Sequence, residues 1–163
     1  MEIRKAVQSD LPALLEIYNY EVLNGVATLD LTPRTLEERQ LWVDAHNVKN
    51  HPLYAAICDG DVAGYVSLSP YREKEAYSST VELSVYVHPN HRKKGVATAL
   101  MAFILDIAKQ DASIRNVVSV ITSGNAASVR LHEKFGFVYS GTIKEVGQKF
   151  GRYLDIDNFY LLV

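Results

Sequence analysis

Alternating and helix-spaced runs of apolar residues follow one another along this chain, separated by turn residues. Between Leu11 and Tyr18 apolar residues recur every three to four positions, which predicts a helix with one buried face. Ser9 is a candidate cap for this helix, and Pro12 falls in its first turn, where a missing N–H costs little. The sequence Thr35-Leu36-Glu37-Glu38 has the form of a capping box and predicts a second helix.

The complete series of expected elements mixes helices and strands along the whole chain. Asp59-Gly60 is a turn pair typical of a hairpin, and residues 24–33 form a loop. The order β-α-α-β-β-β-α-β-α-β-β predicts an α/β (α+β) fold, with helices on both faces of a mostly antiparallel sheet that contains at least one parallel pair. The expected elements are a strand over 2–6, helices over 9–23 and from 35 towards 47, strands over 53–58, 62–69 and 80–88, a helix over 95–111, a strand over 117–121, a helix over 125–135, and strands over 137–145 and 153–162.

Length and charge limit the possible partners. The chain has 163 residues, 48% of them hydrophobic and 22% charged, which fits a single domain over 1–163. Lysine and arginine number 17 against 19 aspartates and glutamates, a net charge of −2. This composition supplies no general basic field, so we expect neither nucleic acid nor a membrane as a partner. Any anion has to be bound by a local arrangement of residues.

The distribution of apolar residues, cysteine and histidine indicates a cytoplasmic protein without a metal. The N-terminal residues lack the apolar centre of a signal peptide, and the most apolar run, 99–105, is far shorter than the roughly 20 residues of a membrane span. The single Cys58 forms neither an internal disulfide nor a cysteine-rich metal site. His88 and His91 lie three apart in a turn without further ligands, so no metal is expected.

Residues 81–98 contain a strand, a basic loop with a glycine, and the start of a helix. Free backbone N–H groups and the positive end of a helix dipole meet at Gly95, and Lys93 and Lys94 add charge of the same sign. Such an arrangement suits a phosphate or pyrophosphate, although the same pattern also describes a solvated basic turn. The spacings of the nucleotide P-loop and of the dinucleotide-binding glycine motif are absent.

The segment Arg92-Lys93-Lys94-Gly95-Val96-Ala97 resembles the R/Q-x-x-G-x-G/A loop of the GNAT acetyltransferases, which hold the pyrophosphate of acetyl-CoA on backbone N–H groups. The expected order of elements is also that of the GNAT fold, so the resemblance spans essentially the whole chain. Within the family, the sequence is similar to the phosphinothricin and methionine sulfoximine acetyltransferases, and it departs from them at Leu83 and Tyr153. The segments that carry this narrower likeness are 69–72, 80–89, 128–133 and 149–152.

This resemblance implies transfer of acetyl from acetyl-CoA to the primary amine of a small amino acid analogue, directly within a ternary complex. It also implies a homodimer, and a strand over 80–88 that diverges from the strand over 117–121 to expose backbone groups to the pantetheine arm. The expected coenzyme contacts are an N–H from Val85, Tyr86 or Val87 for the thioester carbonyl, Arg92, Lys93, Lys94, Gly95, Val96, Ala97 and Thr98 for the pyrophosphate, Asn125 for pantetheine, and Ser128 and Lys134 for pantetheine or phosphate.

Glu82 is a candidate catalytic residue because its neighbours Val81 and Leu83 point to the other face of the strand. A half-buried carboxylate needs a partner or a use, unless its face of the sheet is solvated. Attack on a thioester requires an amine without its extra proton, and burial raises a glutamate pKa towards a value that suits it to take that proton. By resemblance, Glu82 aligns with the general base of the family.

His132 is the second candidate catalytic residue, on one helix face with Asn125 and Ser128. A solitary helical histidine is more often a surface or core residue, but the resemblance assigns this one to proton handling, as general acid or second base. Arg72 is a candidate for binding an acceptor carboxylate, since a guanidinium grips carboxylate in a bidentate fork; surface exposure is the alternative. The candidate acceptor pocket also includes Tyr71, Tyr77, Thr28 and Phe150.

Two other functions stay open from the sequence. Protein or peptide N-acetylation would use the same coenzyme with an open groove. A non-catalytic module that senses coenzyme A would keep residues 92–98 and Asn125 but would have no use for Glu82. The presence of Glu82 together with His132 favours an enzyme.

Overall fold

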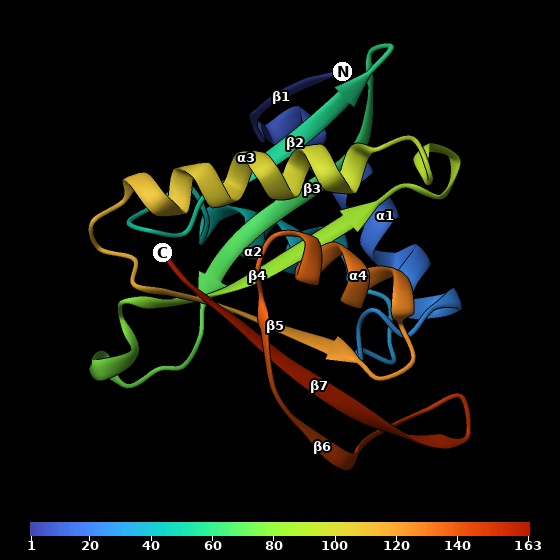
Figure 1. Cartoon of the computed structure of the whole chain (residues 1–163). Helices are drawn as coiled ribbons and strands as arrows, with labels where there is room; N and C mark the ends of the chain where they lie inside the picture. Colours follow the sequence, from blue (N-terminus) through green and yellow to red (C-terminus); the bar gives the residue numbers. More distant parts are fainter.

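One seven-stranded sheet with the strand order β1-β2-β3-β4-β5-β7-β6 forms the centre of the computed structural model, which describes all 163 residues (Figure 1). Strands β4 and β5 are parallel, and every other neighbouring pair is antiparallel. The predicted order of elements and the mixed, mostly antiparallel sheet are confirmed. The strands are β1 (Glu2–Lys5), β2 (Leu53–Cys58), β3 (Asp61–Pro70), β4 (Thr80–Val87), β5 (Asn116–Thr122), β6 (Val138–Lys149) and β7 (Arg152–Leu162). The helices are α1 (Leu11–Asn24), α2 (Leu36–Asp44), α3 (Val96–Gln110) and α4 (Ala126–Lys134), with 3-10 turns at Gln8–Asp10, Glu75–Tyr77 and Pro89–His91.

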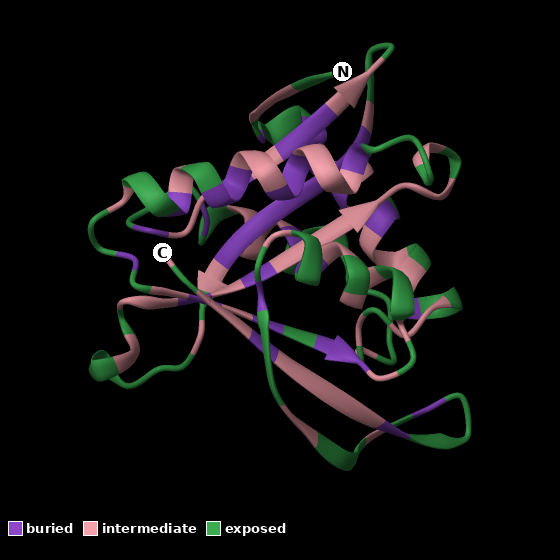
Figure 2. Ribbon diagram, viewed as in Figure 1, coloured by how far each residue is buried: buried purple, intermediate pink, exposed green.

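Helices cover both faces of this sheet, and buried residues gather along its central strands (Figure 2). On one face α3 packs over β2, β3 and β4, around a core of 17 buried residues that includes Leu100 and Leu83. On the other face α1 and α2 cover a core of 6 buried residues that includes Leu14 and Tyr65. The alternation of β4 thus turns Leu83 towards α3 and leaves Glu82 on the face of α1 and α2.

Helix α2 begins as its sequence predicts. The Thr35 hydroxyl accepts from the Glu38 N–H at 3.2 Å, and the Glu38 carboxylate accepts from the Thr35 N–H at 2.8 Å. This reciprocal pair is the capping box. The helix ends at Asp44 rather than near Asn47: the His46 N–H bonds to the carbonyl oxygen of Val43, three residues back, and Asn47 then adopts a left-handed conformation with φ of 58°.

The prediction that Ser9 caps α1 is wrong. A 3-10 turn over Gln8–Asp10 precedes the helix, and no side chain caps its first turn. The Asp10 carboxylate instead accepts from the Val7 N–H at 2.8 Å and pairs with Arg4 at 2.8 Å. A charge-assisted contact from β1 therefore orders this turn.

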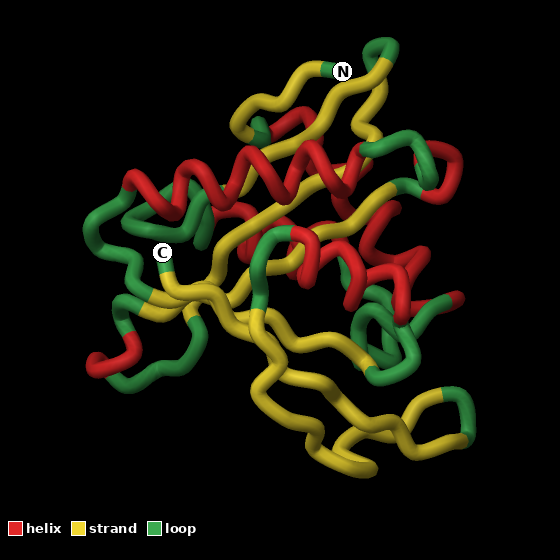
Figure 3. The backbone as a smooth tube through the Cα atoms, viewed as in Figure 1, coloured by secondary structure: helices red, strands yellow, loops and turns green.

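Strands β4 and β5 pair only at their beginnings, where Thr80–Glu82 lies opposite Asn116–Val118. Beyond these residues the two strands separate, and β5 continues along β7 (Figures 1 and 3). The divergence implied by the family resemblance is confirmed. It leaves a wedge in the middle of the sheet, beside the second half of β4.

The hairpin of β6 and β7 is longer than the sequence predicts. Strand β6 continues to Lys149, past the expected end at Glu145. The register of β6 against β7 shifts between Ile143 and Gly147. This bulge interrupts the alternation of side chains between the two faces of the sheet, so the sequence pattern did not show that the strand continues. Gly147 also allows the hairpin to approach the loop after α1, since a Cβ there would lie 2.8 Å from a methyl of Leu29.

Candidate active site

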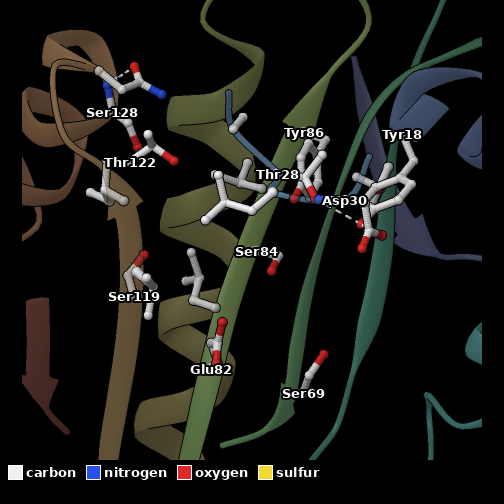
Figure 4. Close-up of a pocket in the computed structure, with 18 of the residues that line it drawn as sticks. Tyr18, Thr28, Asp30, Ser69, Glu82, Ser84, Tyr86, Ser119, Thr122 and Ser128 are labelled. Atoms are coloured by element: carbon white, nitrogen blue, oxygen red, sulfur yellow. Dashed lines mark hydrogen bonds between the residues drawn. The ribbon is translucent and has the colours of Figure 1, made fainter. Parts of the chain in front are cut away.

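A cavity of about 710 Å³ opens where β4 and β5 diverge and continues beneath α1 and α2. Its first lobe, the strand lobe, lies along β4 and β5 and is bordered by Ser119. Its second lobe, the helix lobe, is bordered by Tyr18 and Arg39. Glu82 and Ser84 on β4 lie between the two groups of residues (Figure 4). Residues of both groups thus border one continuous cavity, with Glu82 between them.

The Glu82 side chain enters this cavity from the middle of the sheet, as the strand alternation predicts. Its cross-strand neighbour on β3 is Ser69, which also lines the cavity. Burial raises the pKa of the Glu82 carboxyl above its ordinary value, and no hydrogen bond or neighbouring charge acts against that shift. A carboxylate in this position is suited to accept a proton near neutral pH.

His132 is buried, with 2% of its surface exposed, and both ring nitrogens have partners. Nδ1 lies 2.7 Å from the carbonyl oxygen of Ser128, which only accepts, so Nδ1 carries the hydrogen. Burial lowers the pKa of the imidazole, against the Ser128 hydrogen bond, which acts in the opposite sense. The neutral ring then presents Nε2 as an acceptor, and the Ser119 hydroxyl donates to it at 2.7 Å.

Ser119 was not identified by the sequence analysis. It occupies the inward position of β5 between Val117 and Ile121, both of which belong to the core under α3. A hydroxyl at the inward position between two buried apolar residues was the available signal, since a buried hydroxyl requires a hydrogen-bond partner. The partner comes from α4 and is visible only in the folded chain.

The basic loop has the geometry of an anion site. Gly95 has φ of 81° and Lys93 has φ of 60°, and a Cβ at Gly95 would meet no atom within 4 Å. The first intrahelical bond of α3 joins the Ala99 N–H to the Gly95 carbonyl, so the N–H groups before it are free. Arg92 forms an ion pair with Glu21, at the end of α1. The backbone donors at the start of α3 therefore have no partner within the helix, and Ala97 in this first turn borders the cavity.

The expected coenzyme residues divide into two sets. Those that line the cavity are Val85, Tyr86, Ala97, Asn125 and Ser128. The Asn125 side chain accepts from the Ser128 N–H at 3.2 Å and so caps α4. The remaining ones, Val87, Arg92, Lys93, Lys94, Gly95, Val96, Thr98 and Lys134, lie outside the cavity.

Of the expected acceptor residues, only Thr28 lines the cavity. The Arg72 guanidinium lies 5.0 Å from the ring centre of Tyr71 and 5.5 Å from that of Tyr77, at a separate depression on the surface. Phe150 is 57% exposed at the tip of the β6–β7 hairpin. The single chain therefore does not bring these four residues together with Glu82.

Apart from Thr28, the sequence analysis assigned no role to the residues that border the helix lobe. Arg39 and Trp42 of α2 lie there with Tyr65 of β3 and Tyr18 of α1. The sequence around Arg39 is rich in charged and polar residues, which is typical of a solvated helix face. The weak apolar pattern of α2 gave no indication that its arginine is buried.

The loop after α1 is fastened over the cavity from three sides. The Thr122 hydroxyl donates to the carbonyl oxygen of Val26 at 2.5 Å. The Lys149 ammonium, which is buried, donates to the carbonyl oxygen of Thr28 at 2.9 Å. The Tyr18 hydroxyl donates to Asp30 at 2.5 Å. These contacts fix the loop residues that border the helix lobe.

Two features of other sites are absent. No group of three or more histidine, cysteine, aspartate or glutamate side chains is arranged to hold a metal ion. None of the helices combines the length and apolar character needed to cross a membrane.

Comparisons with known proteins relate this chain to one family of enzymes. The model of the acetyltransferase (GNAT) family matches residues 15–137. The L-methionine sulfoximine/L-methionine sulfone acetyltransferase of Pseudomonas paraeruginosa is 43% identical over 155 residues, covering 94% of this chain and 90% of the relative.

Solved structures of similar proteins share the whole fold. The ribosomal-protein-alanine N-acetyltransferase of Brucella melitensis superposes with a TM-score of 0.96 and 40% identity, covering 100% of both chains. A phosphinothricin acetyltransferase from Sinorhizobium meliloti, solved in complex with acetyl-CoA, gives a TM-score of 0.92 with 33% identity, over 99% of this chain and 88% of that chain.

Proposed function

The chain belongs to the GNAT family of acetyl-CoA-dependent N-acetyltransferases, and we propose that its acceptor is the primary amine of a small amino acid analogue of the methionine sulfoximine or phosphinothricin type. The observation that carries the proposal is the Glu82 carboxylate, which lies unpaired between the two lobes of the cavity. The names of the relatives from Pseudomonas paraeruginosa and Sinorhizobium meliloti support the acceptor class.

In this proposal acetyl-CoA occupies the strand lobe and the basic loop. The free N–H groups at the start of α3 receive its pyrophosphate, and Arg92, Lys93 and Lys94 add positive charge. The pantetheine arm follows the wedge between β4 and β5 past Asn125. The thioester then lies near Glu82, and a backbone N–H of β4 between Val85 and Val87 stabilises its carbonyl oxygen as charge develops.

The acceptor nitrogen loses two protons in this reaction, and no side chain is acetylated on the way. Glu82 removes a proton from the acceptor ammonium, and the amine nitrogen attacks the carbonyl carbon of the thioester. A bond forms between nitrogen and carbon as the carbon–sulfur bond breaks. The nitrogen of the tetrahedral intermediate gives its second proton to the Ser119–His132 pair, and the coenzyme A thiolate takes a proton from water.

His132 is proposed as the second proton acceptor. As a neutral ring with a hydrogen on Nδ1, it receives a hydrogen bond from Ser119 and has no proton to give through Nε2. A proton that reaches the Ser119 hydroxyl can pass to Nε2. The resting ring is neutral, because burial lowers the pKa of the imidazole, so it begins in the form that accepts a proton rather than in the form that donates one.

Thiol release from acetyl-CoA, measured against a panel of acceptors, tests the proposed function. The panel contains methionine sulfoximine, methionine sulfone, phosphinothricin, unmodified amino acids and a peptide with an N-terminal alanine. We expect turnover with the amino acid analogues. The name of the Brucella melitensis protein favours peptide acetylation as the second candidate, and turnover of the peptide alone would establish it. Tight coenzyme binding without release of thiol for any acceptor would indicate a sensor.

A homodimer and a cytoplasmic location are further proposals. Six large side chains on the β6–β7 hairpin are 49% to 63% exposed, which supports an interface there: Val138, Tyr139, Ile143, Val146, Phe150 and Tyr153. Light scattering should give a dimer for the wild type and a smaller mass for Ile143→Asp. A monomeric wild type at high concentration would contradict the dimer. Cell fractionation tests the location.

A further inference from the structure

Arg39 on α2 carries a buried charge that no acidic side chain of the protein pairs. The residue is 4% exposed and borders the helix lobe. Its Nη2 donates to the Tyr65 hydroxyl at 2.6 Å, while its Nε is buried without a partner. None of the ion pairs in the structure involves it. Buried charge and unused donors cost free energy, so a ligand that completes them would be bound favourably.

Aromatic rings hold this guanidinium in place without neutralising it. Its central carbon lies 3.7 Å from the ring centre of Trp42, 4.8 Å from that of Tyr18 and 5.1 Å from that of Tyr65. Contacts over the ring faces stabilise the cation and fix its plane. They leave the donors in that plane available for an oxyanion.

The other charged groups that line the cavity are already paired, with the exception of Glu82. Arg34 lies 2.8 Å from Asp30 and 3.7 Å from Glu38. The neutral His132 adds no charge. The cavity therefore contains one unpaired anion, Glu82, and one unpaired cation, Arg39.

An α-amino acid in water carries an ammonium and a carboxylate, which match these two charges in sign. We propose that Arg39 binds the α-carboxylate of the acceptor while Glu82 faces its amine. This inference rests on the proposed function and deepens it. It places the carboxylate contact on α2 inside the cavity, whereas Arg72 lies outside it. The carboxylate is the acidic group that all the proposed acceptors share, since the side chain of methionine sulfone is uncharged.

Trp42 makes binding at this position measurable without turnover. It is the single tryptophan of the chain and it stacks on Arg39, so its fluorescence should respond to a ligand there. Methionine sulfone and its α-carboxamide differ only at the proposed contact. With coenzyme A bound, we expect Arg39→Met to weaken the binding of methionine sulfone by about 10- to 150-fold. The carboxamide should bind both proteins equally weakly.

Kinetics provide the second readout. The KM for methionine sulfone should rise by the same factor in Arg39→Met, while the KM for acetyl-CoA stays level. Equal affinity of the folded variant and the wild type for methionine sulfone would overturn the proposal, as would a wild type that does not bind this ligand. A wild type that binds methionine sulfone but releases no thiol would overturn the proposed function and leave the Arg39 contact standing.

Three variants separate charge from structure. Tyr65→Phe removes the hydrogen bond between Arg39 and Tyr65, as Arg39→Met does, but it keeps the cation. This variant should therefore retain the preference for carboxylate over carboxamide. Arg39→Lys keeps the positive charge but lacks the two-pronged guanidinium. It should bind methionine sulfone better than Arg39→Met does, and it provides a second test should Arg39→Met fold poorly. Loss of the preference in Tyr65→Phe would overturn the proposal. The proposal would also be overturned if Arg72→Met lost the preference for carboxylate over carboxamide while Arg39→Met retained it.

Discussion

The hydroxyl of Ser119 and Nε2 of His132 lie 2.7 Å apart, and they join β5 to α4 at the wall of the cavity. The hydrogen on Nδ1 is committed to the Ser128 carbonyl, so the donor in this contact is the serine. While the ring is neutral, it can only accept a proton along this hydrogen bond, from the serine side. In the resting protein, therefore, Ser119 is the hydrogen-bond donor and His132 is the acceptor.

Ser119→Ala tests this pair. The variant leaves Nε2 of His132 without its donor and removes the hydroxyl that connects the ring to the cavity. We expect kcat to fall by about tenfold, which is less than the roughly 10²–10⁴-fold contribution of a group that exchanges protons with substrate directly. Steady-state kinetics of the variant, with Ser119→Thr as the matched control that keeps a hydroxyl, measure the effect. Equal loss in both variants would point to packing instead.

Glu82→Gln tests the general base. Glutamine keeps the shape of the side chain but cannot take the ammonium proton. We expect kcat to fall by about 10²–10⁴-fold with little change in acetyl-CoA affinity. The wild-type rate should rise with pH through the raised pKa of Glu82, and this acid limb should be missing from the variant. His132→Ala should cost less. Near wild-type turnover of Glu82→Gln at neutral pH would remove the base role.

The same substitution should stabilise the fold in a defined range of pH. Because the folded-state pKa of Glu82 is raised, the folded protein holds a proton that the unfolded chain has lost above the ordinary value of 4.5. Wild-type stability from this group is thus complete below pH 4.5 and falls as pH rises towards the raised pKa. Thermal unfolding should show the gain in Tm of Glu82→Gln over the wild type growing across that range and then levelling. A gain independent of pH would indicate a cause other than ionisation.

Gly95→Asp and Gly95→Asn form a matched pair at the basic loop. Gly95 has φ of 81°, a conformation that aspartate and asparagine both tolerate better than other residues, so strain is similar in the two variants. Only aspartate adds a negative charge at the helix start. Calorimetry should show acetyl-CoA binding about 10- to 30-fold weaker for the aspartate variant than for the asparagine variant. Identical affinities would move the pyrophosphate elsewhere.

Elements with a strong local signal were predictable from the sequence. The face of Glu82 follows from strand alternation, and the start of α2 follows from Thr35 and Glu38, which bond to each other across one turn. The start of α1 was missed because Asp10 is held by Arg4 from another element. Local patterns do not encode a partner that only folding brings close.

Part of the candidate site was likewise predictable from local sequence, and part of it depends on residues that only folding brings together. Motif spacing pointed to the strand lobe but left the helix lobe unassigned, because Arg39 lies in a polar segment and its burial depends on Trp42 and Tyr65 stacking around it. Arg72 matched a family segment, yet a matched segment does not determine which cavity a side chain reaches. The separation of β4 from β5 came from the resemblance alone, since alternation says nothing about where two strands stop pairing.

The short ladder between β4 and β5 affects how stable the protein is with and without its cosubstrate. The two strands pair over three positions and then separate, so their facing backbone groups do not bond to each other. In the proposed function, the pantetheine arm of acetyl-CoA occupies the space between them. A cosubstrate that binds only the folded state stabilises it by about 2.7 kcal/mol at a concentration one hundred times its Kd. Resistance to unfolding and proteolysis should therefore follow the supply of acetyl-CoA, so that the enzyme persists longest when its acetyl donor is abundant.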